Sequence, residues 1–223
     1  MLHVYAITDS APDLEAVGLD GAELRTVGDE APFAVVSEHA RLSTRLDEGD
    51  LWAHEAVVEE LMDRATVLPM RFDGAVDDEA TLRRILDERR EEFETLLGSV
   101  RGAVELGVRA QVDEEEPVSG DDPHIAGSGG SGTAYLLARA RDQRAAAGVV
   151  TRIHGPLAAL ARQSRRSGRS LRPGLFKAAY LVERDGVDPF RARVEALGSE
   201  LGGGRIVCTG PWPPYSFSSK ENT

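Results

Sequence analysis

Histidines, a cysteine and a glycine run are the residues of this chain whose types could support chemistry. His54-Glu55 begins like the zinc-binding motif H-E-x-x-H, but Val58 occupies the position where the second histidine ligand would stand. His54 also falls on an apolar helical stripe, so we interpret it as a core histidine whose hydrogen bonds are satisfied. The other histidines show no metal-ligand spacing, and the sequence therefore predicts no metal site.

The glycine run Gly127-Ser-Gly-Gly-Ser-Gly132 formally matches the dinucleotide-binding pattern G-x-G-x-x-G. The residues before it are acidic and rich in proline and glycine, whereas that motif needs a buried strand turning into a helix. Cys208 stands in an apolar run with no histidine nearby in the sequence, so a nucleophilic role would need tertiary contacts. No pair of carboxylates stands out as a general acid and base. We therefore expect a protein that is not an enzyme and has no cofactor.

A basic run extends from Arg162 to Arg172 and includes Arg165, Arg166 and Arg169. Its simplest interpretation is a solvated loop. The alternative is an electrostatic contact, either with an acidic partner or with the acidic stretch 113–116 of the same chain. The sequence leaves both open.

The stretch 209–217, Thr-Gly-Pro-Trp-Pro-Pro-Tyr-Ser-Phe, concentrates prolines and aromatic residues in a chain that is only 5% aromatic. Because proline fixes φ and removes a backbone donor, we expect this terminal strip to continue neither a helix nor a sheet. Pro213-Pro214 favours an extended polyproline II geometry. The strip could cap a domain core, or it could present Trp212 and Tyr215 to a partner.

Bulk composition narrows the function classes. The formal net charge is −12 and the pI about 4.9, which argues against a general nucleic-acid binder because such a protein needs a basic surface. One cysteine cannot form an internal disulfide, which favours a reducing compartment. The N-terminus has no basic region followed by a long apolar stretch, and no segment approaches the roughly 20 apolar residues that span a membrane. We expect a cytoplasmic protein that binds neither nucleic acid nor membrane.

The first hundred residues alternate between strand and helix signals. Apolar runs predict strands at 2–7, 23–27 and 33–37, the first of them buried on both faces. Asp50 reads as the N-cap of a helix with an apolar stripe from Leu51 to Met62. The strand-like segment 66–72 is interrupted by Pro69, which predicts an edge strand or a bulge. A second helix spans 82–97, and its polar side, 87–92, predicts a solvated face with helical charge pairs.

The second half begins with a strand at 103–112, whose strict alternation predicts one buried face and antiparallel neighbours. A flexible Gly- and Ser-rich loop at 113–132 and a long helical segment at 133–160 follow. A strand at 177–182, a helix capped by Asp188 with Pro189 at its first position, and a strand at 205–209 complete the half. If the basic run contains an edge strand, the order is the βαββαβ order of a ferredoxin-like domain.

We therefore predict an α+β chain of two domains. The N-terminal α+β domain covers 1–100 and mixes helices and strands. The C-terminal ferredoxin-like domain covers 101–215, includes the flexible loop 113–132, and leaves 216–223 as a tail.

The sequence as a whole resembles the gas vesicle protein GvpL/GvpF family. The resemblance runs nearly end to end, and the terminal strip is its most specific part. The matching segments are 2–7 (LHVYAI), 52–55 (WAHE), 67–72 (VLPMRF), 102–105 (GAVE), 132–136 (GTAYL), 177–182 (KAAYLV) and 209–217 (TGPWPPYSF). The chain departs from the family at Asp73-Gly74, where Gly-Thr is usual, and in the Gly- and Ser-rich loop.

The resemblance implies an accessory or minor structural protein of gas vesicles, built from two α+β domains of which one is ferredoxin-like. Such a protein is expected to bind the hydrophobic shell protein and other accessory proteins, and to assist nucleation or assembly of the vesicle. A small-molecule sensor or enzyme on ferredoxin-like domains is the alternative, since that fold hosts many functions. The candidate contact residues for a partner are Pro69, Arg71, Arg165, Arg166, Arg169, Trp212 and Tyr215.

Overall fold

The chain forms two compact units in the computed structural model, which describes residues 1–41, 47–111, 148, 150–166, 175–201 and 205–219. Unit 1 comprises residues 1–105 together with the segment from Pro211 onward, and unit 2 comprises residues 106–210. Unit 2 is therefore inserted in the chain between the two segments of unit 1. The expected domain boundaries differ from these units mainly at the C-terminus, where the terminal strip belongs to unit 1. The expected flexible loop 113–132 lies outside the described residues.

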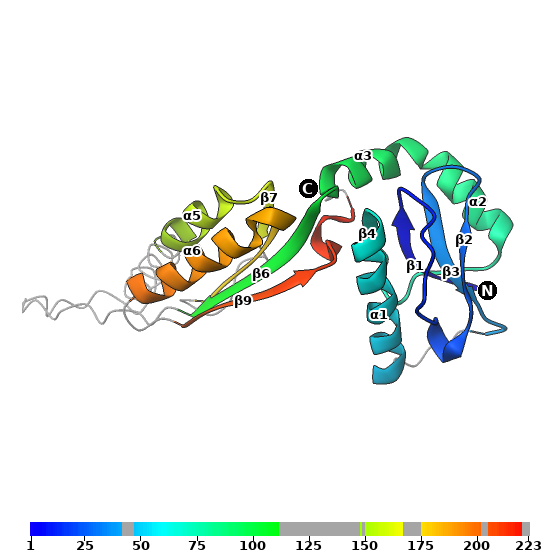
Figure 1. Cartoon of the computed structure of the whole chain (residues 1–223), viewed down its shortest axis with the longest axis horizontal. Coiled ribbons are helices and arrows are strands. Elements are labelled where there is room, and N and C mark those ends of the chain that lie inside the picture. The colour runs from blue at the N-terminus through cyan, green and yellow to red at the C-terminus, as the bar shows by residue number, and fades with distance from the viewer. Residues whose placement is uncertain (42–46, 112–147, 149, 167–174, 202–204, 220–223) are drawn as a thin grey trace, which may run out of the picture. The chain divides into compact units, whose positions relative to one another are not determined.

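Unit 1 contains a mixed set of helices around an antiparallel sheet with the strand order β2-β3-β1-β4, and β5 also pairs with β1 (Figure 1). The strands are β1 (Leu2–Thr8), β2 (Leu24–Val27), β3 (Phe33–Glu38), β4 (Val67–Pro69) and β5 (Ala75–Val76). Every residue of β1 is buried, which confirms the prediction that this strand has two covered faces. Its register against β3 shifts between Val4 and Ala6, so Tyr5 sits in a bulge.

The helices of unit 1 begin and end at residues that differ from those predicted from the spacing of apolar residues. They are η1 (Leu19–Gly21), α1 (Glu48–Arg64), α2 (Glu79–Glu88), α3 (Arg90–Val100) and η4 (Tyr215–Phe217). The N-cap of α1 is Asp47, whose carboxylate accepts from Gly49 N at 2.7 Å, and the prediction of Asp50 was wrong. The predicted single helix 82–97 is two helices separated at Arg89, where ψ is 17°. Its apolar face continues across this break, so the sequence pattern could not reveal it.

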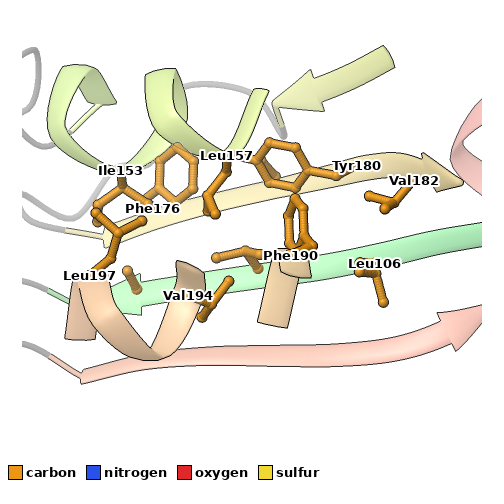
Figure 2. Packing of buried hydrophobic residues seen from close by; sticks show 12 residues of the cluster. Leu106, Ile153, Leu157, Phe176, Tyr180, Val182, Phe190, Val194 and Leu197 are labelled. Carbon is orange, nitrogen blue, oxygen red and sulfur yellow. The ribbon is translucent and has the colours of Figure 1, made fainter. Parts of the chain in front are cut away.

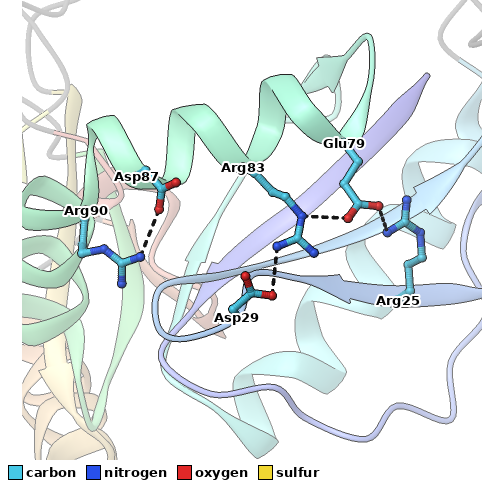
Figure 3. A network of polar contacts seen from close by, with 6 residues as sticks. All are labelled: Arg25, Asp29, Glu79, Arg83, Asp87 and Arg90. Carbon is cyan, nitrogen blue, oxygen red and sulfur yellow. Dashed lines mark hydrogen bonds and ion pairs between the residues drawn. The ribbon is translucent and has the colours of Figure 1, made fainter.

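Charged side chains on α2 hold it beside the edge strand β2 (Figure 3). Glu79 accepts from Arg25 of β2 at 2.7 Å and from Arg83 at 2.8 Å, and Arg83 reaches Asp29 in the β2–β3 turn at 3.1 Å. These guanidinium hydrogen bonds lower the pKa of Glu79. Farther along, Asp87 pairs with Arg90 at 3.1 Å, as the predicted solvated face requires. Exposed pairs of this kind contribute little stability each, so their main effect is to position α2.

Unit 2 contains a four-stranded sheet with the order β7-β8-β6-β9. Two of its strands cross the boundary of the unit, since β6 (Ala103–Gln111) begins in unit 1 and β9 (Arg205–Trp212) ends in it. Its other described elements are η2 (Val150–His154), α5 (Gly155–Ala158), β7 (Gln163–Arg166), β8 (Leu175–Glu183), η3 (Arg184–Gly186) and α6 (Val187–Glu200). The basic run does contain a strand, which meets the condition set for the βαββαβ order and differs from the simpler interpretation as a loop: β7 pairs antiparallel with β8 at the edge of the sheet. Of the helical segment expected at 133–160, only residues 148 and 150–160 are described.

The core of unit 2 lies on one face of this sheet, between the strands and the helices α5 and α6 (Figure 2). Alternate residues of β6 and β8 point into it, which confirms the alternation predicted for 103–112. Tyr180 and Phe190 are fully buried with ring centroids 5.1 Å apart. Helix α6 begins at Val187, so Asp188 lies inside the helix and is not its N-cap, and Pro189 is at the third helical position.

The terminal strip does not follow its predicted geometry. Strand β9 continues through Pro211 to Trp212, whereas the sequence predicted that the strip could not extend a sheet. The edge position of β9 explains the difference, because an edge strand has a side with no partner strand, where the missing N–H of proline costs no ladder hydrogen bond. After the buried Pro213-Pro214 the chain turns into η4 and brings Phe217 to 1% exposure. Within unit 1 the strip is a core cap, with Trp212 left at 45% exposure.

We predict that Phe217→Ala lowers the free energy of unfolding of unit 1 by about 3 kcal/mol, because it removes a fully buried ring and leaves a cavity. Urea unfolding followed by circular dichroism measures the change. Trp52→Ala is the control, and since its ring is 73% exposed we expect a change of less than about 1 kcal/mol. Equal losses in the two variants would contradict the cap.

Candidate functional site

A buried histidine pair lies under α1 in unit 1. His54 Nε2 contacts Met70 O at 3.0 Å and His54 Nδ1 contacts His3 Nε2 at 2.8 Å. A carbonyl only accepts, so His54 carries its proton on Nε2, and His3 Nε2–H donates to His54 Nδ1. These two hydrogen bonds need only one ring proton on each histidine, so both rings can be neutral in this arrangement. The prediction that His54 is a satisfied core histidine is confirmed.

Burial lowers the pKa of both histidines, which favours the neutral rings of this hydrogen-bonded pair. Desolvation, reinforced by the charge that His54 would carry, lowers the pKa of His3 to about 4, and desolvation also lowers the pKa of His54. The rings of Tyr5 and Phe72 enclose the pair, with Tyr5 stacked on His54 at 5.3 Å between centroids. The pair is therefore a structural element rather than a general base that a solvent-borne substrate could reach.

A second buried chain of hydrogen bonds runs from Tyr5 toward the surface. Tyr5 Oη lies 2.8 Å from Ser37 Oγ, which lies 2.7 Å from His39 Nε2. Leu19 N donates to Tyr5 Oη at 2.8 Å, so the loop before η1 is held by the same hydroxyl. Gly18 is required here, because a Cβ at that position would stand 2.5 Å from the Tyr5 oxygen. These hydrogen bonds hold the loop before η1 against the strands β1 and β3.

The terminal strip is held to unit 1 by two carboxylates. Tyr215 Oη donates to Glu55 of α1 at 2.9 Å. Ser216 donates to both oxygens of Glu105, from its backbone N and its hydroxyl, each at 2.7 Å. Burial raises the pKa of Glu55, an effect that the Tyr215 hydrogen bond opposes and the neighbouring Glu59 reinforces. These bonds join residues more than a hundred positions apart.

The candidate contact residues of unit 1 divide into inward and outward groups. Pro69 is buried in β4 opposite Ala6, so it is not an exposed contact, although β4 does lie at the sheet edge as predicted. Tyr215 is half-buried against α1. Arg71 and Trp212 are exposed. The elements that carry Pro69 and Tyr215 meet, because η4 packs against β4.

The basic candidates lie in unit 2. Arg165 and Arg166 stand next to each other on the edge strand β7, with Arg165 half-buried and Arg166 exposed. Arg162, just before β7, is engaged by Glu183 at 2.6 Å. Arg169 lies outside the described residues, as does the glycine run 127–132.

The cysteine and the buried tyrosine hydroxyl of unit 2 do not have the lowered pKa that a nucleophile or general base would need. Burial raises the pKa of the Cys208 thiol, and the nearby Arg191 only partly opposes this, so the thiol stays protonated near neutral pH. His154 Nδ1 lies 3.0 Å from the buried Tyr180 hydroxyl, whose pKa burial raises. Among the residues that the structure describes, no group of three or more His, Cys, Asp or Glu side chains could hold a metal ion.

Two surface features were not anticipated. Trp52 on α1 is 73% exposed. Its position outside the apolar stripe of the helix could have predicted this exposure from the sequence. A cleft of about 500 Å³ lies between the loop 12–17 and the edge strand β2, with Leu14, Val17 and Leu24 in its lining. Within the described part of the chain, no helix has the length and apolarity to cross a membrane.

A family model described as "Gas vesicle synthesis protein GvpL/GvpF" matches residues 1–219 of the chain. Among curated proteins, Gas vesicle protein F of Streptomyces sp. is 32% identical over 235 residues, covering 96% of this chain and 98% of that protein. Gas vesicle protein L of the same organism is 30% identical, covering 97% and 92%. Gas vesicle protein F1 of Halobacterium salinarum is 26% identical, also covering 97% and 92%.

The fold is also similar to that of two crystal structures. The gas vesicle protein GvpF from Anabaena sp. PCC7120 matches with a TM-score of 0.83 at 20% identity, over 99% of this chain and 97% of that one. GvpF from Microcystis aeruginosa matches with a TM-score of 0.78 at 18% identity, over 98% and 99%.

We predict that the histidine pair makes unit 1 less stable in mild acid. The pKa of His3 is about 4 in the folded chain and 6.5 as its ordinary value, so the unfolded chain binds more protons in that interval. Stability is therefore lost as the pH falls from about 6.5 toward 4, and His3 alone should cost about 2 kcal/mol at about pH 5 relative to pH 7.5.

Urea unfolding of unit 1 at both pH values measures this loss. His3→Gln keeps a donor toward His54 but cannot titrate, so this variant should lack the loss of about 2 kcal/mol that His3 contributes between these pH values. An unchanged pH dependence in His3→Gln would show that His3 is not a source of it.

Proposed function

This chain belongs to the GvpL/GvpF family of gas vesicle synthesis proteins and has a role in gas vesicle formation, and from that premise we propose that it is a non-enzymatic accessory protein that binds the hydrophobic shell protein. The observation that carries the proposal is the family match over residues 1–219, which leaves almost none of the chain for an unrelated function. Named relatives F and L both align over nearly their full lengths.

The physical basis of the proposed activity is protection of apolar surface. A shell protein with a large apolar surface aggregates unless a partner covers that surface until ordered addition to the growing shell. A carrier that binds the unassembled form holds it available by mass action. We propose that this chain supports nucleation or assembly in this way, in the cytoplasm and at the vesicle, together with other accessory proteins.

Part of the expected contact set remains suited to binding. Arg71 and Trp212 are exposed in unit 1, and Arg166 is exposed on an edge strand of unit 2, which could accept a partner strand. Pro69 and Tyr215 act inward and support these positions. Arg165 and Arg169 remain proposed contacts of the same basic run.

We further propose that residues 106–210 form a ferredoxin-like domain. The element order of unit 2 and its strand order β7-β8-β6-β9 support this assignment, with β7 supplying the strand concealed in the basic run. The rival function, a sensor or enzyme on this domain, is not favoured by its one thiol, whose pKa is raised.

Co-expression of the tagged chain with the shell protein tests the proposal. We expect the shell protein to co-purify with the chain from the soluble fraction. Arg71→Ala combined with Trp212→Ala should lower the recovered shell protein by about tenfold, since aromatic and arginine side chains dominate contact energies.

Arg84→Ala is the control, because Arg84 is an exposed arginine on α2 that pairs only weakly with Glu88 at 3.2 Å. It should leave recovery unchanged. A shell protein that never co-purifies, together with normal vesicles after deletion of the gene, would refute the binding function.

A further inference from the structure

The outward face of α1 exposes apolar side chains that the fold of unit 1 does not use. Trp52 is 73% exposed and Leu51 is 42% exposed, while His54, Val57, Val58 and Leu61 on the opposite face are buried. With 3.6 residues per turn, Trp52, Ala56 and Glu59 lie along one stripe of the helix, and Ala56 and Glu59 are exposed too. A tryptophan so exposed near the N-terminal end of a helix face suggests a contact surface.

Carboxylates surround Trp52 on this face. Glu48 precedes it by one turn, and Glu55 and Glu59 follow it at positions i+3 and i+7. Within the described residues no arginine or lysine forms an ion pair with any of these three. Glu60, on the flank of the same helix, differs because Arg64 pairs with it at 2.9 Å. Burial is the main cause of the raised pKa of Glu55, and the like charge of the neighbouring Glu59 adds to it.

Both flanks of the face are fixed by contacts within unit 1. On one flank, the carboxylate of Glu60 accepts from the backbone N of Glu15 and of Ala16 at 2.9 and 2.8 Å, which holds the loop 12–17 against α1. On the other, Tyr215 donates to Glu55. The helix and the carboxylates are therefore positioned in advance, which lowers the entropic cost of binding.

We propose that the outward face of α1 binds a cationic amphipathic segment of a partner protein. Lysine or arginine side chains of that segment pair with Glu48, Glu55 and Glu59, and an apolar or guanidinium group covers Trp52. The same carboxylates repel nucleic acid and anionic lipid surfaces, so the occupant is a protein segment. The proposal rests on the proposed binding function only in requiring that the chain has a protein partner.

A synthetic peptide tests the face without the native partner. The background is Trp212→Phe, in which Trp52 is the remaining tryptophan of the two in the chain. The probe is a peptide of about 18 residues, or five helical turns, with lysine and leucine at helical spacing, and its comparison replaces every lysine with glutamate. We expect the lysine peptide to shift the Trp52 fluorescence and to bind less tightly as salt is raised, and the glutamate peptide to do neither.

Charge variants show whether the site or the overall acidity attracts the peptide. Glu55→Gln with Glu59→Gln removes two charges from the face, keeps an acceptor for Tyr215, and should weaken binding about tenfold. Glu91→Gln with Glu94→Gln removes the same charge from exposed positions on α3 and should change affinity by no more than about twofold. Trp52→Ala, followed by calorimetry, should also weaken binding about tenfold.

Equal weakening by the two pairs of glutamate variants, or equal binding of both peptides, would overturn the proposal, because net charge alone would then explain the attraction. The result is independent of the shell-protein experiment. Peptide binding at Trp52, with no recovery of shell protein and with normal vesicles after deletion of the gene, would refute the proposed function and leave this inference standing. Recovery of shell protein without site-specific peptide binding would support the proposed function and overturn this inference.

Discussion

Unit 1 depends on the burial of β1 along its whole length. This strand has no face in water, yet it carries the polar side chains of His3, Tyr5 and Thr8. An unpaired polar group in such a position is costly, so each needs a partner outside the strand. His54 of α1 is the partner of His3, Ser37 of β3 and the backbone N of Leu19 are the partners of Tyr5, and Thr8 donates to the carbonyl of Ser10 just beyond the strand. The helix, the neighbouring strand and the loop are thereby placed by the hydrogen-bonding needs of one strand.

Strands could be predicted from the sequence where the local pattern of apolar and polar residues determines which faces are buried. The alternation at 103–112 and the uniform apolarity at 2–7 gave their strands, because burial of one or both faces is recorded residue by residue. Prediction from the sequence failed where several local solutions compete or where the deciding contact is distant. Asp47 and Asp50 are both acceptable N-caps, and only the structure distinguishes them. The place of the terminal strip depends on Tyr215 meeting Glu55, which lies 160 residues away in the chain.

Helix α1 divides its surface between stability and recognition. Its inward face is apolar except for His54, whose two ring nitrogens are both paired, so this face leaves nothing for a ligand. Its outward face presents Trp52 among carboxylates that the described part of the chain does not neutralise. The apolar stripe of the inward face is enough to predict the helix from the sequence. The large aromatic residue Trp52, on the opposite side, also indicates an exposed apolar surface. The contrast between the faces is the strongest structural support for a role in binding.

The order of the segments along the chain also sets an order in time. Unit 1 is completed by residues from Pro211 onward, which a ribosome makes only after all of residues 106–210. Until then the nascent unit lacks the ring of Phe217 in its core, and Glu55 and Glu105 lack their partners Tyr215 and Ser216. Domains generally fold as they emerge, from the N-terminus onward, but an inserted unit prevents this for the segment that surrounds it. The hydrogen bond that fixes Glu55 on the α1 face can therefore form only after residues 106–210 have been made.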